Sequence, residues 1–300
     1  MTGNNLKKYL PLGILFLGIM PALLITMFQR PDTDENNRTA DITPLSLPVS
    51  APVEPDAGYA SSTVIVYGDS RDGEAQHRGL VNLMDQLPFQ AVIHVGDVAY
   101  YPDDQVVWET FMEITAPLRD RAPFWIIAGN HDTPEDQFEV YFPDEAGNHL
   151  HTVNDVSFLF LDLERGIDEA AQFVRDHATV RTIVITHYPL YTGGPHRTDS
   201  LVQKAQALHE IFLENHIQLV FSGHDHNYQR IERDGISYLV TGGGGAPLYS
   251  VSDIEGLQSS AKANHFVILT INQTSYTIRT VDIDGTVIDE TVIPSPDPNS

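Results

Sequence analysis

Five short, largely apolar segments of the chain each end in side chains that can bind a metal ion. In order, these side chains are Asp69, Asp97 with Tyr100, Asn130 with His131, His187, and His224 with His226. Glycine precedes the polar group in four of the five segments, so backbone and metal can approach each other closely. Nitrogen and hard oxygen donors without sulfur suit iron, zinc or manganese. The set is large enough to hold two ions that share one carboxylate.

No single member of this set identifies a function. An aspartate after a strand is most often a turn residue or a helix N-cap, and a lone histidine is most often structural. The joint pattern says more, because chemistry in open α/β sheets gathers at the carboxyl ends of the strands. The central segment runs from Phe89 to Val95 and ends at Gly96-Asp97, with Tyr100 three residues on. A carboxylate and a phenol at these positions can face one pocket.

The elements that must position these groups alternate between strands and helices. Short β-branched and apolar runs predict strands at 63–67, 89–95, 124–128, 156–161, 182–186 and 219–222. Apolar residues at helical spacing predict helices at 74–87, 106–118, 168–177 and 201–215. After residue 245 the pattern changes to alternating strands at 266–271, 275–281 and 287–293. This order predicts an α/β (α+β) domain in which two mixed β-sheets pack together with helices outside.

The composition excludes several classes of function. With 300 residues, 42% of them hydrophobic, the chain is long enough for one large domain or two small ones. It has no cysteine, which excludes disulfides and thiolate metal sites. The net charge is −24, so nucleic acid, which requires a basic surface, is not an expected partner.

The first 60 residues differ from the rest of the chain. Lys7 and Lys8 precede an uncharged stretch, Tyr9 to Gln29, whose ~20 residues would cover roughly 30 Å as a helix, the thickness of the bilayer hydrocarbon core. We expect residues 1–29 to form a transmembrane helix that anchors the protein in a membrane; a cleaved signal segment, giving a secreted protein, is the alternative. Residues 30–60 are rich in Asp, Pro, Thr and Ser, and this composition predicts a disordered linker. The lysine pair favours export of the following domain, 61–295, to the periplasmic or extracellular side.

Five sequence blocks resemble those of the calcineurin-like metallophosphoesterases and occur in the same order. They are Gly68-Asp69, Gly96-Asp97-Val98-Ala99-Tyr100, Gly129-Asn130-His131-Asp132, Val184-Ile185-Thr186-His187 and Gly223-His224-Asp225-His226. Most of that superfamily has Asp-x-His in the first block, whereas this chain has Asp69-Ser70-Arg71. The purple acid phosphatase branch replaces the lost imidazole by a tyrosine three residues after the bridging aspartate, as Tyr100 is here. The chain departs from that branch at Arg71, where glycine is usual.

The resemblance implies a four-layer sandwich, with 61–295 as the catalytic domain, and assigns roles to the site residues. The first metal ion would be bound by Asp69, Tyr100 and His226, the second by Asn130, His187 and His224, and Asp97 would bridge them. In this family the first ion is typically iron(III) and the second is iron, zinc or manganese. The branch also has a substrate-contacting histidine nine residues after the metal-binding one, where His196 lies. His131 and His196 are therefore the candidates for holding phosphate oxygens and donating a proton to the leaving alkoxide. The alternatives are that His131 only orients a metal ligand and that His196 is an ordinary loop histidine.

The activity that the resemblance implies is hydrolysis of phosphate monoesters by a metal-bound hydroxide. Three anionic ligands with a trivalent and a divalent ion leave a local charge of about +2, and surface acids beyond a Debye length of ~8 Å are screened. An acidic protein can therefore still bind a phosphate ester. Two alternatives are a phosphodiesterase acting on cyclic nucleotides or other diesters, and an inactive metal-binding surface module, against which the complete ligand set argues.

The remaining polar features have simpler interpretations. Arg71 and Arg230 either contact substrate phosphate or pair with nearby acids. The four glycines at 242–245 lack the Gly-Lys-Ser/Thr of a phosphate-binding loop and predict a tight turn. The other histidines are expected to be structural: His77, His94, His149, His151, His177, His209, His216 and His265.

Overall fold

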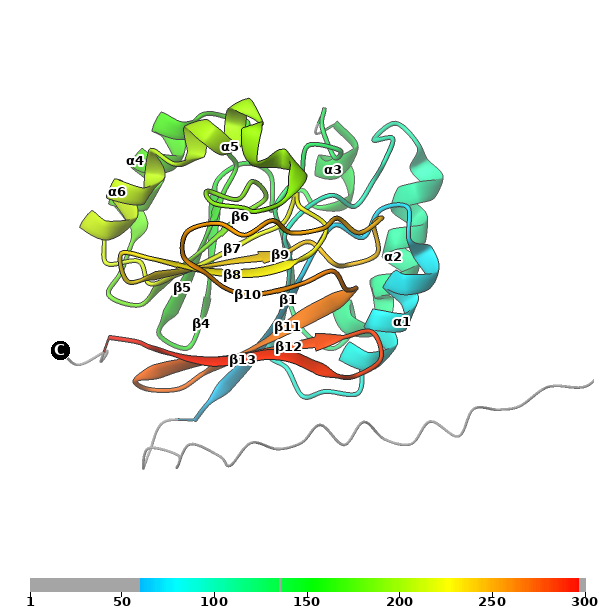
Figure 1. Cartoon of the computed structure of the whole chain (residues 1–300). Helices are drawn as coiled ribbons and strands as arrows, with labels where there is room; N and C mark the ends of the chain where they lie inside the picture. The colour runs from blue at the N-terminus through cyan, green and yellow to red at the C-terminus, as the bar shows by residue number, and fades with distance from the viewer. Residues whose placement is uncertain (1–59, 135, 297–300) are drawn as a thin grey trace, which may run out of the picture. The chain divides into compact units, whose positions relative to one another are not determined.

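The computed structural model describes residues 60–134 and 136–296, in which two β-sheets are stacked between layers of helix (Figure 1). The first sheet has six strands in the order β13-β12-β11-β1-β2-β3. Their bounds are β1 (Ser62–Tyr67), β2 (Ala91–His94), β3 (Phe124–Ile126), β11 (His265–Ile271), β12 (Ser275–Asp282) and β13 (Val287–Pro294). β1, β2 and β3 are parallel, and β11 to β13 are added antiparallel.

The second sheet has seven strands in the order β10-β8-β9-β7-β6-β5-β4. Their bounds are β4 (His149–Val153), β5 (Val156–Leu161), β6 (Thr182–Thr186), β7 (Leu219–Ser222), β8 (Tyr228–Arg233), β9 (Ile236–Thr241) and β10 (Leu257–Ala261). β5, β6, β7 and β9 are parallel, while β4, β8 and β10 are antiparallel to their neighbours. Both sheets are therefore mixed, as the sequence predicts.

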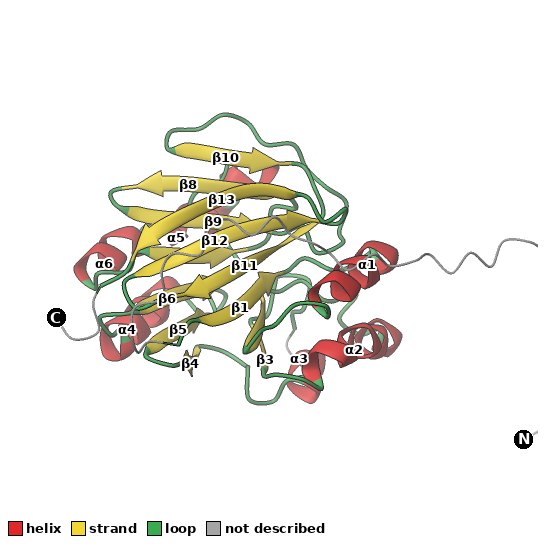
Figure 2. Ribbon diagram, turned by 90° about the horizontal axis from the view of Figure 1, so that it is seen from below, coloured by secondary structure: helices red, strands yellow, loops and turns green. Residues whose placement is uncertain are grey.

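The helices form the two outer layers (Figure 2). They are α1 (Glu74–Met84), α2 (Gln105–Arg119), α3 (Asp136–Tyr141), α4 (Ile167–His177), α5 (Ser200–Ala205) and α6 (Leu208–Glu214), with a 3₁₀ turn, η1, at Pro195–Thr198. Apolar residues of α1 and α2 pack on the first sheet, and those of α4, α5 and α6 pack on the second. α3 packs against Trp108 of α2. The predicted α/β architecture of two mixed sheets with helices outside is confirmed.

The central strands are apolar at nearly every position because both faces of each sheet are buried. In β1, Val64 and Val66 lie in the core between the two sheets, whereas Ile65 and Tyr67 lie in the core under α1 and α2. Successive side chains of a strand point to opposite faces, so a central strand in a four-layer sandwich needs apolar residues at every position.

The single helix predicted at 201–215 is wrong, because it is two short helices. At the junction the backbone makes tighter i→i−3 bonds, from Ala207 N to the Lys204 carbonyl and from His209 N to the Gln206 carbonyl. This turn lets Val202 of α5 and both Leu208 and Phe212 of α6 reach the same core under the second sheet.

The β8–β9 hairpin was not predicted, although its turn was visible in the sequence. Asp234 and Gly235 both have positive φ, 49° and 84°, which is the conformation an Asp-Gly hairpin turn requires. The strands β4 and β10 and the helix α3 were also missed, since five or six residues carry too little periodicity to identify.

The expected membrane anchor, residues 1–29, and almost all of the expected linker, 30–60, lie outside the described residues and stay predictions, as does the boundary of the domain. Among the described residues, no helix is both long and apolar enough to cross a bilayer.

Burial of His265 at the start of β11 makes stability depend on pH. Its Nδ1 donates to the Ala263 carbonyl and its Nε2 accepts from Thr241 Oγ1, so the fold holds the neutral ring. Burial lowers the pKa of His265 from 6.5 to about 4. As pH falls below 6.5, the unfolded chain binds a proton that the folded chain does not, and the free energy of unfolding decreases.

The free energy of unfolding of wild type should decrease between pH 7 and pH 4.5. In His265→Gln we expect this decrease to be smaller by about 2–3 kcal/mol. Urea unfolding of chelator-treated protein at the two pH values measures both. The exposed His177, changed to Gln, is the matched control and should keep the wild-type pH dependence. Equal pH dependence in wild type and His265→Gln would contradict this assignment.

Candidate metal centre

The carboxyl ends of parallel strands from both sheets meet at one place. The turn after β1 bonds to the turn after β2, from Asp69 N to the Gly96 carbonyl at 2.9 Å. In the second sheet, Gly223 N after β7 bonds to the His187 carbonyl after β6, also at 2.9 Å. The two sheets are joined there by His224 N, which donates to the Asp69 carboxylate at 3.0 and 3.1 Å.

One group of ligand atoms comprises Asp69, Asp97 and His226, all buried, with one atom of each within 4.8 Å of the others. His226 Nδ1 donates to the Pro247 carbonyl at 2.9 Å, and its Nε2 lies 3.6 Å from Asp69 Oδ1. In the neutral ring this leaves the Nε2 lone pair facing the carboxylates. Such an orientation, fixed by the bond at the other ring nitrogen, is typical of metal-binding histidines.

A second group adjoins the first. His187 Nε2 and His224 Nδ1 lie 3.0 and 2.9 Å from Asn130 Oδ1, and His187 Nδ1 donates to the Val95 carbonyl at 2.8 Å. His187 Nε2 is also 3.4 Å from Asp97 Oδ1, so Asp97 contacts both groups. The lone pair of His187 Nε2 faces the Asn130 amide oxygen, which is also an acceptor. Either a cation between them or a rotated amide that presents its NH₂ group removes this conflict. The buried carboxylates nearby favour the cation.

The charges at this centre are not balanced by the protein itself. Burial raises the pKa of Asp69, and the adjacent Asp97 raises it further. Burial also acts to raise the pKa of Asp97, but His187, the His131 backbone N–H and Arg71 outweigh it and lower it. Arg71 Nε lies 3.2 Å from Asp97 Oδ2 and is a single positive charge against two buried carboxylates. The donor set therefore fits metal ions, which would supply the missing positive charge.

The backbone is strained where these ligands sit. Asp69, Asp97 and His224 have φ of 57°, 61° and 68°, in the left-handed region that residues other than glycine rarely adopt. Strain of this kind gathers at functional sites, where the surrounding structure holds it in place.

Glycine precedes four of the proposed ligands, and at two of these positions, Gly129 and Gly223, a side chain would collide with the centre. A Cβ at Gly129 would lie 2.2 Å from Asp97 Oδ1, and one at Gly223 would lie 2.3 Å from Asp69 Oδ2. The expectation that glycine permits close approach is confirmed at these positions.

Asp132 organises the centre, a role that sequence reasoning missed. Its fully buried carboxylate accepts four backbone N–H bonds of 2.8–3.0 Å, from Asp97, Val98, Ala99 and Gly129. These bonds fix the turn after β2 against the turn after β3. The signal was its place two residues after Asn130 in the third sequence block.

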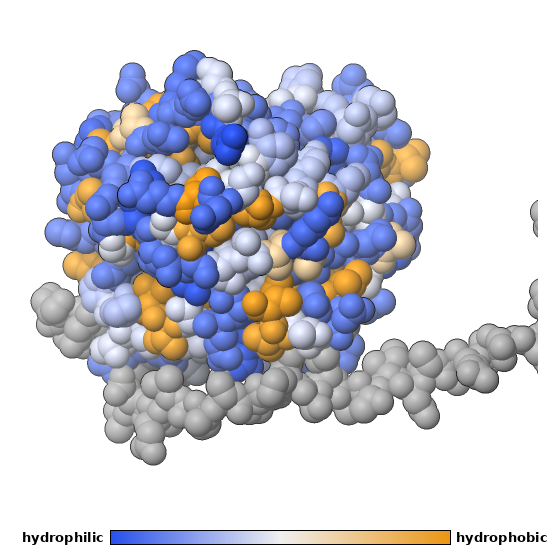
Figure 3. All heavy atoms as spheres, in the orientation of Figure 1, coloured by the Kyte–Doolittle hydropathy of each residue, from blue (hydrophilic) through white to orange (hydrophobic). Residues whose placement is uncertain are grey.

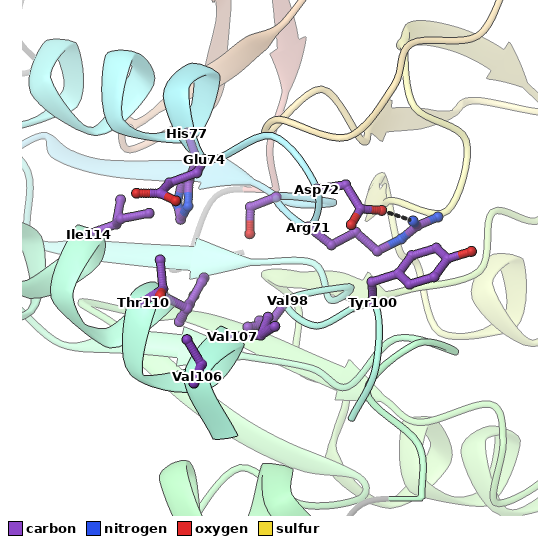
Figure 4. Close-up of a pocket in the computed structure, with 12 residues that line it drawn as sticks. Arg71, Asp72, Glu74, His77, Val98, Tyr100, Val106, Val107, Thr110 and Ile114 are labelled. Carbon is purple, nitrogen blue, oxygen red and sulfur yellow. Dashed lines mark hydrogen bonds and ion pairs between the residues drawn. The ribbon is translucent and has the colours of Figure 1, made fainter. Parts of the chain in front are cut away.

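Tyr100 and His131 lie at the rim, with their rings stacked 5.2 Å apart. Tyr100 is 41% exposed, and the Arg71 guanidinium lies over its ring at 5.2 Å. The Tyr100 hydroxyl makes no hydrogen bond to any residue among 60–134 and 136–296, and its assignment as a ligand stays a prediction. Tyr100 and Arg71 line a cavity of about 380 Å³ together with Glu74 and His77 of α1 and Val106 of α2. These lining residues are labelled in Figure 4.

His196 lies on the other side of the centre, in η1. Its Nδ1 is 2.8 Å from the buried Asp225 Oδ1, and its ring is 4.4 Å from the ring of His224. The hydrogen bond to Asp225 raises the pKa of His196, despite the opposing effect of burial. Asp225, which the sequence left without a role, therefore orients this histidine. Arg230 pairs with Asp289 at 2.7 Å, in agreement with the simpler of its two interpretations.

The fold and these residues together define a class of protein. The chain matches the calcineurin-like phosphoesterase family over residues 62–228, more than half its length, and belongs to that family. The resemblance found in the sequence is thereby confirmed.

Within the family, the similar proteins point to the purple acid phosphatase-like branch. Purple acid phosphatase 5 of Arabidopsis thaliana is 27% identical over 238 residues, covering 74% of this chain and 56% of its own. Purple acid phosphatase 19 of the same plant is 28% identical, covering 56% of this chain and 45% of its own. The chain thus spans about half the length of these relatives.

Solved structures agree on the fold. The purple acid phosphatase PPD1 from yellow lupin has a TM-score of 0.68 at 17% identity, covering 80% of this chain and 55% of its own. GAP50, the anchor in the inner membrane complex of Plasmodium, has a TM-score of 0.64 at 15% identity, covering 79% of this chain and 89% of its own.

We expect Asp132→Asn to lower the free energy of unfolding by about 2–4 kcal/mol, because an amide nitrogen would face backbone N–H donors and leave them unsatisfied. Urea unfolding in chelator isolates this effect from metal binding. Asp120→Asn is the control, since Asp120 is exposed at the end of α2. Equal unfolding midpoints for the two variants would show that Asp132 does not hold the turns.

Proposed function

We propose that this protein is a metal-dependent phosphatase of the purple acid phosphatase type, which hydrolyses phosphate monoesters with two metal ions. The observation that carries the proposal is the contact of Asp97 with both ligand groups, through Asp69 and His226 on one side and His187 on the other. The purple acid phosphatases among the similar proteins support the same activity.

The proposed ligands follow the two groups. Asp69, His226 and Tyr100 would hold one ion, Asn130, His187 and His224 the other, and Asp97 would be shared between them. Iron(III) with a divalent iron, zinc or manganese ion suits these oxygen and nitrogen donors. When bound, such a pair supplies Lewis acidity to a phosphoryl oxygen and makes water acidic enough to attack near neutral pH.

The other side chains would bind and orient the substrate. His196, oriented by Asp225, lies beside His224 and can donate a proton to the leaving oxygen. His131, stacked on Tyr100 at the opposite rim, can donate to a phosphate oxygen. Arg71 donates to Asp97 through Nε and to Asp72 through Nη1 (Figure 4). Its guanidinium also lines the cavity, where it can meet the negative charge of the ester.

Asp97→Asn tests the shared ligand. We expect kcat for p-nitrophenyl phosphate to fall by a factor of roughly 10² or more, because the neutral amide cannot hold two cations together. Metal content measured on the same samples should fall from two ions per chain, with an unchanged far-UV circular dichroism spectrum. Full activity in this variant would contradict the proposal. If wild type hydrolyses bis-p-nitrophenyl phosphate faster than p-nitrophenyl phosphate, its substrates are diesters rather than monoesters.

Tyr100→Phe tests the branch. Purified wild-type protein loaded with iron should absorb in the visible range through phenolate-to-iron(III) charge transfer, and the variant should be colourless. Tyr101→Phe, next in sequence and 64% exposed, is the matched control and should keep the colour. A fully active wild type without this absorption band would overturn the assignment of Tyr100 as a ligand.

A further inference from the structure

A second set of metal-binding side chains lies at the edge strand of the second sheet. Glu145 comes from the segment between α3 and β4, and His149 and His151 are two residues apart on β4, so they share one face of the strand. One ligand atom of each lies within 4.8 Å of the others. We propose that Glu145, His149 and His151 bind a divalent transition-metal ion such as zinc.

The hydrogen bonding of His149 carries the proposal. Its Nδ1 lies 2.9 Å from the Gly147 carbonyl oxygen, which can only accept, so this nitrogen carries the proton. The Nε2 of the neutral ring then has a lone pair, and it lies 2.9 Å from Glu145 Oε2. A lone pair and a carboxylate oxygen at that distance repel each other, and a metal cation held between them would turn the repulsion into attraction.

Among the described residues, the Nε2 atom of His149 also lacks a hydrogen bond of its own. Its Nε2 is buried and has no partner in hydrogen-bond geometry within the described part of the chain, although the carboxylate is at contact distance. The side chain is nine-tenths buried, so water does not offer a substitute. A buried polar atom aimed into a cluster of ligand atoms is what a metal site requires.

The donor set suits zinc. Two imidazole nitrogens and one carboxylate, with a fourth position left for water, form a recurrent zinc ligand set. The separations from Glu145 oxygens to the two Nε2 atoms are 2.9–3.0 Å, against roughly 3.3 Å for the edge of a tetrahedron with ~2.0 Å bonds. The carboxylate and each imidazole therefore need to move apart by only a few tenths of an ångström.

Neighbouring groups already hold the ligands. Trp125 stacks on His151 with ring centroids 4.5 Å apart and planes 2° from parallel, and Phe160 stacks on His149, also at 4.5 Å. Ile126 N donates to Glu145 Oε2 at 3.4 Å. Metal ligands are usually fixed by contacts of this kind.

The place of this cluster gives the ion a structural role. β3 is an edge strand of the first sheet and β4 an edge strand of the second (Figure 2). Trp125 and Ile126 belong to β3, and both contact the cluster. A bound ion would therefore join the two sheets beside the strand that leads to Asn130.

Zinc binding by metal-free full-length protein tests the proposal. To separate this cluster from the strand-end centre, the measurements use an Asp69→Asn/His226→Gln background, in which that centre is impaired. We expect calorimetric titration to give one more zinc equivalent in this background than in the same chain carrying His151→Gln. His177→Gln, on the exposed face of α4, is the matched control and should leave the stoichiometry unchanged. Equal zinc stoichiometry with and without His151→Gln overturns the proposal.

A second measurement keeps the test valid if His151→Gln fails to fold. Cobalt(II) added to the background chain should give the visible bands of a tetrahedral site, and their absence overturns the proposal. Glu145→Gln keeps the shape of the side chain and separates a metal site from a cluster held by hydrogen bonds alone. If the cluster binds metal, zinc should raise the Tm of the background chain but not that of the same chain with Glu145→Gln. An equal rise in both chains overturns the proposal.

Discussion

The centre of this protein depends on the burial of two carboxylates side by side. Asp69 and Asp97 are 0% and 1% exposed, and within the described residues the cation that contacts them directly is Arg71, through Asp97. Burying unpaired charge in this way costs several kcal/mol per ion. Backbone N–H groups of His224 and His131 donate to the two carboxylates and offset part of that cost. The part of that cost which the N–H groups do not offset is the physical reason for expecting cations between the strand ends.

Several features around the carboxylates follow from this constraint. The left-handed backbone at Asp69 and Asp97 turns each chain sharply after its strand, so the side chain points back into the centre. Asp132 holds the turn of Asp97 in place with its four N–H bonds. The absent side chains of Gly129 and Gly223 leave room for the carboxylates themselves. A residue that looks merely structural, such as Asp132, thus shapes the ligand geometry as strongly as a ligand does.

The sequence predicted the layers and most of the polar residues that gather at the strand ends, because both leave strong local signals. Central strands buried on both faces are apolar throughout, and in four of the five blocks the polar group follows such a run after a glycine. What it missed depends on contacts between distant residues. The bond from His196 to Asp225, the bonds from Asp97, Val98 and Ala99 to Asp132, and the stacking of Trp125 on His151 join residues 26–35 positions apart. His149 and His151 were interpreted as structural histidines, because nothing local connects them to Glu145 as a ligand.

Each ligand group draws on both sheets. Asp69 and Asp97 follow strands of the first sheet, while their companion His226 follows a strand of the second, and Asn130 is likewise paired with His187 and His224 from the opposite side. Neither sheet alone contains a complete set of donors for either of these two groups. A folding intermediate in which the sheets had not docked would therefore lack part of each set. Tight binding of metal at the strand-end centre would require both sheets in place, so occupancy of that centre would report complete folding.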